Sequence, residues 1–166
     1  MNSDSKVEIS IETSDKMAFY GCSFTESYYA VKNKSWINKL SNLLDLPTLN
    51  FGVSGRRIVE LSEFIRSNYN PYPSSGIGIK ELKPTYIVIQ NIGNETLHLV
   101  SGATLELYIQ QIREMVENIK AVGAIPVFGT DWCIQNPSID VQLKAMADEL
   151  GIIYCPIGTV CEKSCE

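Results

Sequence analysis

Three residues of different types in this chain could together carry out acyl transfer. Ser23, Gly55 and Asn94 each lie in a polar or glycine-containing turn that follows a short apolar run. A serine hydroxyl is a useful nucleophile only when a base takes its proton and hydrogen-bond donors stabilise the negative charge that develops on the oxygen of the attacked carbonyl group. An unobstructed backbone N–H and an asparagine amide are such donors, each typically worth about 3–4 kcal/mol in the transition state. The sequence therefore indicates a serine nucleophile with an oxyanion hole.

This chemistry requires the three turns to lie side by side, and the pattern of the chain predicts that they do. Short apolar runs alternate with longer amphipathic segments, as in repeated βαβ units around a parallel sheet. The expected strands are Met17–Tyr20, Leu49–Phe51, Tyr86–Gln90, Ile125–Phe128 and Ile152–Cys155. Their carboxyl ends meet at one edge, where open α/β sheets bind ligands. The predicted fold is α/β, a three-layer, flavodoxin-like, doubly wound parallel sheet of five strands.

Four amphipathic helices are expected between these strands. Their apolar faces run from Trp36 to Leu44, Ile58 to Ile65, Leu105 to Ile119 and Val141 to Leu150. Gly123 and Gly151 stand where a left-handed C-terminal cap is expected before a strand. Asn136-Pro137 predicts the start of the last helix. The segment 68–76, rich in Pro, Gly and Ser, is expected to be a long surface loop.

The length and net charge of the chain limit the number of domains and the classes of partner. The chain has 166 residues, enough for one domain, which we place at residues 17–166 with residues 1–16 as an N-terminal extension or edge strand. The formal net charge of −5 argues against nucleic acid or an anionic membrane as a partner, because both require clustered Lys and Arg. We find no signal peptide and no apolar stretch of bilayer length, which predicts a protein of the cytoplasm or of a virion.

Cysteine usage favours free thiols over a disulfide framework. The chain has five cysteines, an odd number in a sequence without a signal peptide. Cys161 and Cys165 could form a metal half-site, but no histidine or second cysteine pair has matching spacing. We expect neither a metal nor a cofactor.

The three turns resemble the first three sequence blocks of the SGNH (GDSL-like) hydrolases. The matching segments are Gly21-Cys22-Ser23-Phe24-Thr25, Asn50-Phe51-Gly52-Val53-Ser54-Gly55 and Gly93-Asn94-Glu95, in the family's order and spacing. The resemblance implies that Ser23 is the nucleophile and that Ser23 N–H, Gly55 N–H and the Asn94 side chain form the oxyanion hole. It also implies metal-free hydrolysis of esters or thioesters, often acyl groups on sugars or lipids. Each block alone would equally fit a structural turn, and Cys22 replaces the family's usual aspartate.

The sequence departs from the family after the fifth strand. The family places an Asp-x-x-His pair there, just before a last helix, whereas residues 156–166 contain no such pair and leave no room for the helix. Removing the base from a serine triad costs about a million-fold in turnover. The one histidine, His98, follows Asn94 and could be a substitute base or a substrate contact, or an exposed loop residue. Arg56, next to Gly55, could bind an acidic group of the substrate or be a solvated charge at a helix start.

Two functions from different classes stay open on the sequence alone. One is an SGNH-type serine esterase or acylhydrolase acting on a small-molecule or carbohydrate ester, with its base supplied by a partner, by an absent segment or by His98. The other is a non-catalytic binding or assembly module of a larger complex such as a virion. Without the last helix, one face of the third to fifth strands would be bare, so we expect a second copy or a partner chain to cover it.

Overall fold

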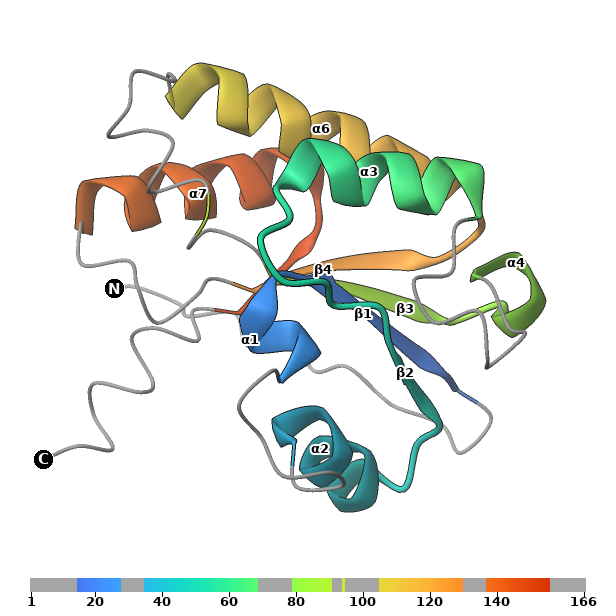
Figure 1. Cartoon of the computed structure of the whole chain (residues 1–166). Helices are drawn as coiled ribbons and strands as arrows, with labels where there is room; N and C mark the ends of the chain where they lie inside the picture. Colours follow the sequence, from blue (N-terminus) through green and yellow to red (C-terminus); the bar gives the residue numbers. More distant parts are fainter. Residues whose placement is uncertain are drawn as a thin grey trace, which may run out of the picture.

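A five-stranded parallel sheet lies between two layers of helices (Figure 1). The structure, a computed structural model, describes residues 15–27, 35–68, 79–90, 94, 105–129 and 137–155, the first four of the last range as backbone only. The strands are β1 (Met17–Gly21), β2 (Thr48–Asn50), β3 (Tyr86–Gln90), β4 (Ile125–Gly129) and β5 (Ile153–Cys155). Their order is β2-β1-β3-β4-β5, and each neighbouring pair is parallel. The doubly wound α/β fold expected from the sequence is thus confirmed.

The four helices expected from apolar spacing are present, and the described part of the chain contains two further short helices. The expected helices are α2 (Trp36–Leu44), α3 (Ile58–Ser67), α6 (Leu105–Ala121) and α7 (Pro137–Leu150), and the additional ones are α1 (Ser23–Glu26) and α4 (Ile79–Leu82). Four residues make little more than one helical turn, too short for an apolar period to be recognised. Gly123 and Gly151 have the positive φ of a left-handed cap, 83° and 62°, and α7 begins at Pro137, as expected.

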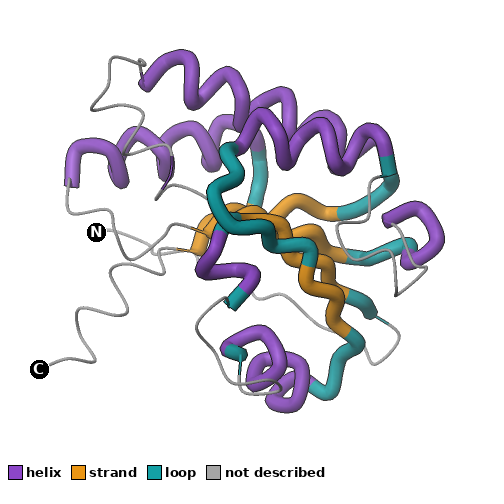
Figure 2. Tube along the Cα trace, viewed as in Figure 1, coloured by secondary structure: helices purple, strands orange, loops and turns teal. Residues whose placement is uncertain are grey.

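The sheet separates two apolar cores, and the helices divide between its faces (Figure 2). Successive side chains of β1 point to opposite faces, so that Tyr20 packs in the larger core with α3, α6 and α7, and Phe19 packs in the smaller core with α2. Every residue of β1 and β3 is buried. Central strands buried on both faces explain the unbroken apolar runs seen in the sequence.

The α2 side of the sheet is better covered than the sequence suggested. Tyr86, Val88 and Val127 are only 6–7% exposed, because they pack in one cluster that includes Phe19 and residues of α2. That a second copy or a partner chain covers this face of the sheet stays a prediction. Exposure is confined to the margin, where Ile125 is 44% exposed. The expected N-terminal edge strand and the segment after β5 lie outside the described residues.

The register of the sheet brings the ends of β1, β2 and β3 to one edge. Gly21, the last residue of β1, is level with Gln90, the last residue of β3. On the other side Phe19 pairs with Asn50, and the chain continues alongside β1 through a hydrogen bond from Phe51 N–H to the Phe19 carbonyl. The turns that carry Ser23 and Gly55 therefore leave the sheet at the same edge. In the described part of the chain, none of the helices combines the length and the apolar character needed to cross a bilayer.

Candidate active site

Ser23 is the first residue of α1, directly after β1. Cys22 is the N-cap residue, with an extended backbone (φ −90°, ψ −153°) and only 1% exposure. Ser23 itself is half-buried. The backbone amides in the first turn of a helix have no acceptor within the helix, so the N–H of Ser23 can serve a ligand. Strand and helix start thus present the hydroxyl and the amide of one residue at the carboxyl edge of the sheet.

Two glycines allow α1 to lie directly against the neighbouring chain segments. A Cβ on Gly21 would overlap Thr25 Oγ1 and the Gln90 carbonyl oxygen. A Cβ on Gly52 would overlap the backbone at Glu26 N. The helix start that carries Ser23 is therefore packed at backbone contact against both the β2 side and the β3 side.

Thr25 connects the ends of all three strands through hydrogen bonds. Its buried hydroxyl donates to Gln90 Oε1 at 2.9 Å, on β3. Its carbonyl accepts from Asn50 Nδ2 at 2.6 Å, on β2, and Asn50 Oδ1 accepts in turn from Gly52 N–H at 2.8 Å. Buried polar groups of this kind are costly when unpaired. The network therefore fixes the position of α1 relative to β2 and β3.

The turn that contains Gly55 is fastened to β1 and α1. Val53 N–H donates to the Gly21 carbonyl at 3.0 Å. The carboxylate of Glu26 accepts a hydrogen bond from Ser54 N–H at 2.7 Å and another from the Ser54 hydroxyl. Gly55 is exposed, with φ +77°, a conformation that favours glycine. Among the described residues its N–H has no hydrogen-bond acceptor, so it can donate to a ligand.

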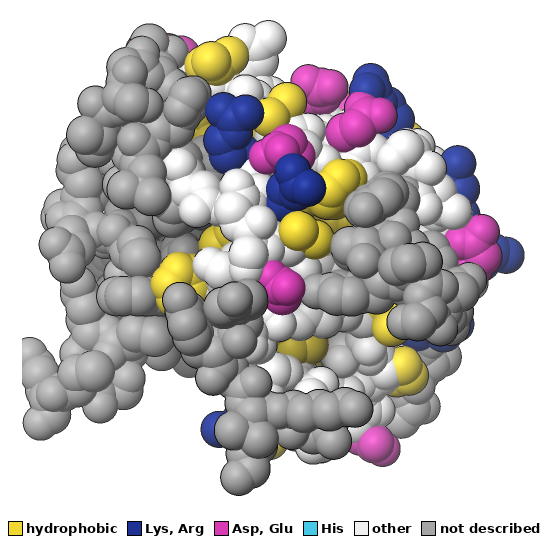
Figure 3. Space-filling view, in the orientation of Figure 1, with side chains coloured by type: hydrophobic (Ala, Val, Ile, Leu, Met, Phe, Trp, Pro, Cys, Tyr) yellow, Lys and Arg dark blue, Asp and Glu magenta, His cyan; other side chains and the backbone are white. Residues whose placement is uncertain are grey.

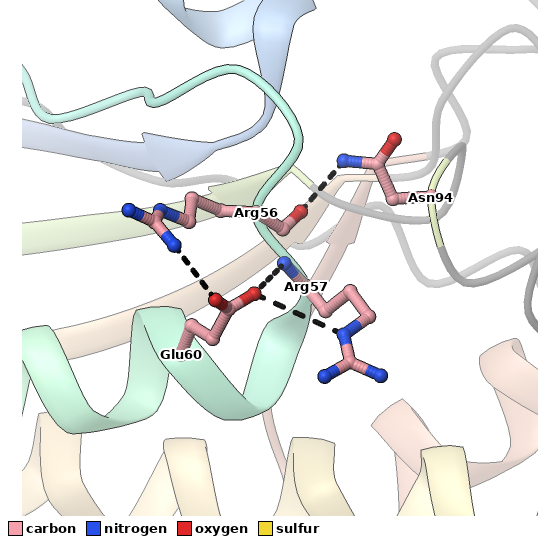
Figure 4. A network of polar contacts seen from close by, with 4 residues as sticks. All are labelled: Arg56, Arg57, Glu60 and Asn94. Atoms are coloured by element: carbon pink, nitrogen blue, oxygen red, sulfur yellow. Dashed lines mark hydrogen bonds and ion pairs between the residues drawn. The ribbon is translucent and has the colours of Figure 1, made fainter.

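Asn94 lies beside this turn and is held by it. Its side-chain Nδ2 donates to the backbone carbonyl of Arg56 at 2.7 Å (Figure 4). An asparagine amide has two N–H donors. One is used on Arg56, and among the described residues the second has no acceptor. The structure therefore brings the two residues expected to donate into the oxyanion hole together, on a turn joined to the helix of Ser23.

Comparisons with known proteins bear on the fold. No protein-family model matches this sequence, and no curated protein sequence matches it either. Solved structures do match. AlinE4, an SGNH-hydrolase family esterase, superposes with a TM-score of 0.65 over 87% of this chain and 77% of its own, at 17% identity. The fold is that of the SGNH hydrolases.

Two further solved structures have a similar fold. The psychrotrophic esterase EstA from Pseudoalteromonas sp., in a structure inhibited by monoethylphosphonate, has a TM-score of 0.65 over 84% of this chain and 75% of its own, at 12% identity. A GDSL-like lipase from Bacteroides thetaiotaomicron has a TM-score of 0.59 over 84% of this chain and 67% of its own, at 16% identity. At identities this low, the structural matches establish the SGNH fold alone. The chemistry has to be argued from the residues of this chain.

Arg56 contributes to the site through its backbone, whereas its guanidinium points away from Asn94 (Figure 4). That guanidinium pairs with Glu60 at 2.8 Å and lies over the Phe64 ring, 5.8 Å from its centroid. Arg57 N–H also donates to Glu60, at 2.9 Å. Binding of an acidic substrate group by Arg56 stays a prediction, and such a group would compete with Glu60.

Glu60 is held as a carboxylate by these partners. Partial burial raises its pKa, but the hydrogen bond from Arg57 N–H and the adjacent Arg56 guanidinium outweigh burial and leave the pKa below its ordinary value. Around it, acidic and basic side chains alternate on this face of the molecule (Figure 3). A groove at this place is lined by Arg56, Glu63 and Glu114 among others, so it has no single sign of charge.

Some residues considered in the sequence analysis cannot be placed. His98, Glu95 and the segment 156–166 lie outside the described residues. Within the described ranges, no three His, Cys, Asp or Glu side chains are grouped to hold a metal ion. Neither Cys22 nor Cys155 is part of a disulfide, and burial raises the pKa of the Cys155 thiol.

Sequence reasoning missed Glu26 and Gln90. Neither has a spacing signal, because each partner is far away along the chain, 28 residues for Ser54 and 65 for Thr25. Only the topology that brings the strand ends together shows these contacts.

Proposed function

We propose that this chain is a serine esterase or acylhydrolase of the SGNH type, acting on a small-molecule or carbohydrate ester. One observation carries the proposal: the turn that offers Gly55 N–H is hydrogen-bonded both to the helix that starts with Ser23 and to the amide of Asn94. A nucleophile and two donors then face the same edge of the sheet. This is the arrangement that attack on an ester carbonyl requires.

The reaction follows from these groups. Ser23 Oγ bonds to the carbonyl carbon of the ester while a base takes its proton, and the carbonyl oxygen becomes an oxyanion. Ser23 N–H, Gly55 N–H and the second N–H of Asn94 donate to that oxygen. The C–O bond to the alcohol then breaks, the alcohol leaves with the proton, and an ester of Ser23 remains. Water activated by the same base releases the acid and restores the serine.

The base is the part of the proposal that rests on the sequence. His98 is the only histidine of the chain and follows Asn94 by four residues. It is our candidate for the base, and a base from a partner chain is the alternative. Substitution of His98 by Ala abolishes turnover in the first case and leaves it unchanged in the second.

The comparisons support an ester substrate. Similar structures are those of an esterase, a GDSL-like lipase and an esterase inhibited by monoethylphosphonate. Tetrahedral phosphorus compounds mimic the transition state of acyl transfer. We therefore expect a phosphonate reagent to react with Ser23.

A second candidate is a non-catalytic binding or assembly module in a larger complex such as a virion. The exposed margin of the sheet at Ile125 favours it, since an apolar side chain 44% exposed on a strand could meet a second copy or a partner chain. In that case the hydrogen bonds around Ser23 serve stability alone.

Turnover of p-nitrophenyl acetate separates the two functions. The esterase proposal predicts hydrolysis by the parent protein and its loss in Ser23→Ala. The matched control is Ser67→Ala on α3, whose exposed hydroxyl bonds only within its own helix. Equal rates for the parent and Ser23→Ala would favour the binding module.

A further inference from the structure

Glu26 makes an unusual connection across the site. It is the last residue of α1, three positions after Ser23, and it is half-buried. Its Oε2 accepts from both the backbone N–H and the hydroxyl of Ser54, which lies 28 residues further along the chain. Within the described ranges it forms no ion pair with Lys or Arg. Its hydrogen bonds therefore go to the Gly55 turn.

The two residues after Ser54 are those that form the oxyanion hole. Gly55 offers its N–H, and the carbonyl of Arg56 holds the amide of Asn94 at 2.7 Å. A hydrogen bond that fixes Ser54 therefore also fixes the backbone from which Gly55 N–H projects and to which the Asn94 amide is bonded. Glu26 and Ser23 belong to the same short helix. The carboxylate of Glu26 therefore fixes the position of the two donors relative to the nucleophile.

Packing does little to hold this turn. Ser54 and Gly55 are exposed, and a Cβ built on Gly55 meets no atom within 4 Å. The backbone bonds that flank the turn, Val53 N–H to the Gly21 carbonyl at 3.0 Å and Arg56 N–H to the Val53 carbonyl at 3.2 Å, anchor its base. A hydrogen bond to a carboxylate is stronger than one between neutral groups. Among the described contacts, the hydrogen bonds from Ser54 to the Glu26 carboxylate tie the tip of the turn to α1.

We propose that Glu26 is a positioning residue, whose carboxylate holds the turn 54–56 so that Gly55 N–H and the Asn94 amide point at the oxygen of the carbonyl group whose carbon Ser23 attacks. This inference rests on the proposed function for its purpose. Its geometry can be tested separately.

The structural test uses ¹H–¹⁵N spectra and amide hydrogen exchange of the full chain. Glu26→Ala should raise the exchange rate of Ser54 N–H about tenfold or more, and shift the Gly55 N–H and Asn94 side-chain signals. Glu26→Gln keeps an acceptor oxygen and should restore most of the protection. Ser54→Ala keeps the hydrogen bond from the backbone N–H to Glu26. The amide exchange rate at position 54 should therefore stay close to that of the parent. Glu63→Ala, an exposed carboxylate on α3, is the control. Unchanged exchange and unchanged Gly55 and Asn94 signals in Glu26→Ala would overturn the positioning role.

The functional test measures the rate at which a fluorophosphonate reagent labels Ser23. We expect Glu26→Ala to label about tenfold more slowly than the parent and Glu26→Gln to recover most of that rate, at thermal unfolding midpoints close to the parent's. Equal labelling rates for parent and Glu26→Ala would also overturn the role. Absence of labelling in the parent itself would overturn the proposed function alone, because the exchange measurements still decide whether Glu26 holds the turn.

Discussion

The side-chain amide of Asn94 donates at 2.7 Å to the backbone carbonyl of Arg56, the residue after Gly55, and its second N–H has no acceptor among the described residues. If this N–H binds the oxyanion, Asn94→Ala should lower kcat/KM for p-nitrophenyl acetate about 100- to 1000-fold. The free energy of unfolding should change by only about 1 kcal/mol, since the lost hydrogen bond is exposed to solvent. Asn118→Ala is a matched control, because Asn118 donates to Ser62 Oγ at 2.7 Å away from the site. Equal losses of activity in both variants would contradict the assignment.

The buried hydroxyl of Thr25 should matter for stability. Thr25→Val keeps the shape but leaves Gln90 Oε1 without its donor at 2.9 Å. We expect a loss of about 1–3 kcal/mol in the free energy of unfolding, measured by urea denaturation. The exposed hydroxyl of Ser67 provides the comparison, and Ser67→Ala should stay within about 0.5 kcal/mol of the parent. A Thr25→Val protein as stable as the parent would show that the Thr25–Gln90 bond contributes nothing net.

Two glycines of the site should respond differently to alanine. Gly21→Ala places a methyl group on Thr25 Oγ1 and the Gln90 carbonyl, so we expect a loss of about 3 kcal/mol or more. Gly55→Ala meets no atom but must adopt φ +77°, which costs about 1–2 kcal/mol. Urea unfolding of both variants measures the difference. A larger loss for Gly55→Ala than for Gly21→Ala would contradict the close packing of α1 on the sheet.

Glu60 should make the stability of the α3 start depend on pH. Its pKa in the folded protein lies below its ordinary value, so its contribution is fully present above the unfolded pKa and is lost as pH falls through the folded pKa. Glu60→Gln should therefore lower the unfolding free energy at pH 7 by about 0.5–1 kcal/mol. The difference from the parent should shrink below about pH 4. Urea titrations at both pH values test this, and a difference that grows on acidification would have the wrong sign.

The fold could be predicted because its signals are local in the sequence. The apolar runs at β1 and β3 and the amphipathic period of α6 each lie within one segment, and the left-handed caps at Gly123 and Gly151 mark where helices give way to strands. The doubly wound parallel sheet followed from the alternation of strands and helices, whereas the strand order β2-β1-β3-β4-β5 comes from the structure. The short helix α1 was missed because Ser23–Glu26 is too short to show a period.

The site could be predicted only in part. Ser23, Gly55 and Asn94 could be proposed because each follows a predicted strand and parallel strands end at one edge, and their catalytic roles stay predictions. Glu26 and Gln90 could not be found, since their contacts join segments far apart in sequence and depend on the register of the sheet. The burial of Val88 and Val127 in one cluster with residues of α2 could not be predicted either, because no local pattern shows it.

The most direct test of the central claim is the site of covalent modification by a fluorophosphonate reagent, read by intact-mass and peptide mass spectrometry. We expect one adduct per chain, located on Ser23, absent in Ser23→Ala and retained in Ser67→Ala. We also expect slower labelling in Asn94→Ala. No adduct on the folded parent protein, or an adduct that persists in Ser23→Ala, would contradict the claim that Ser23 is a nucleophile served by Gly55 and Asn94.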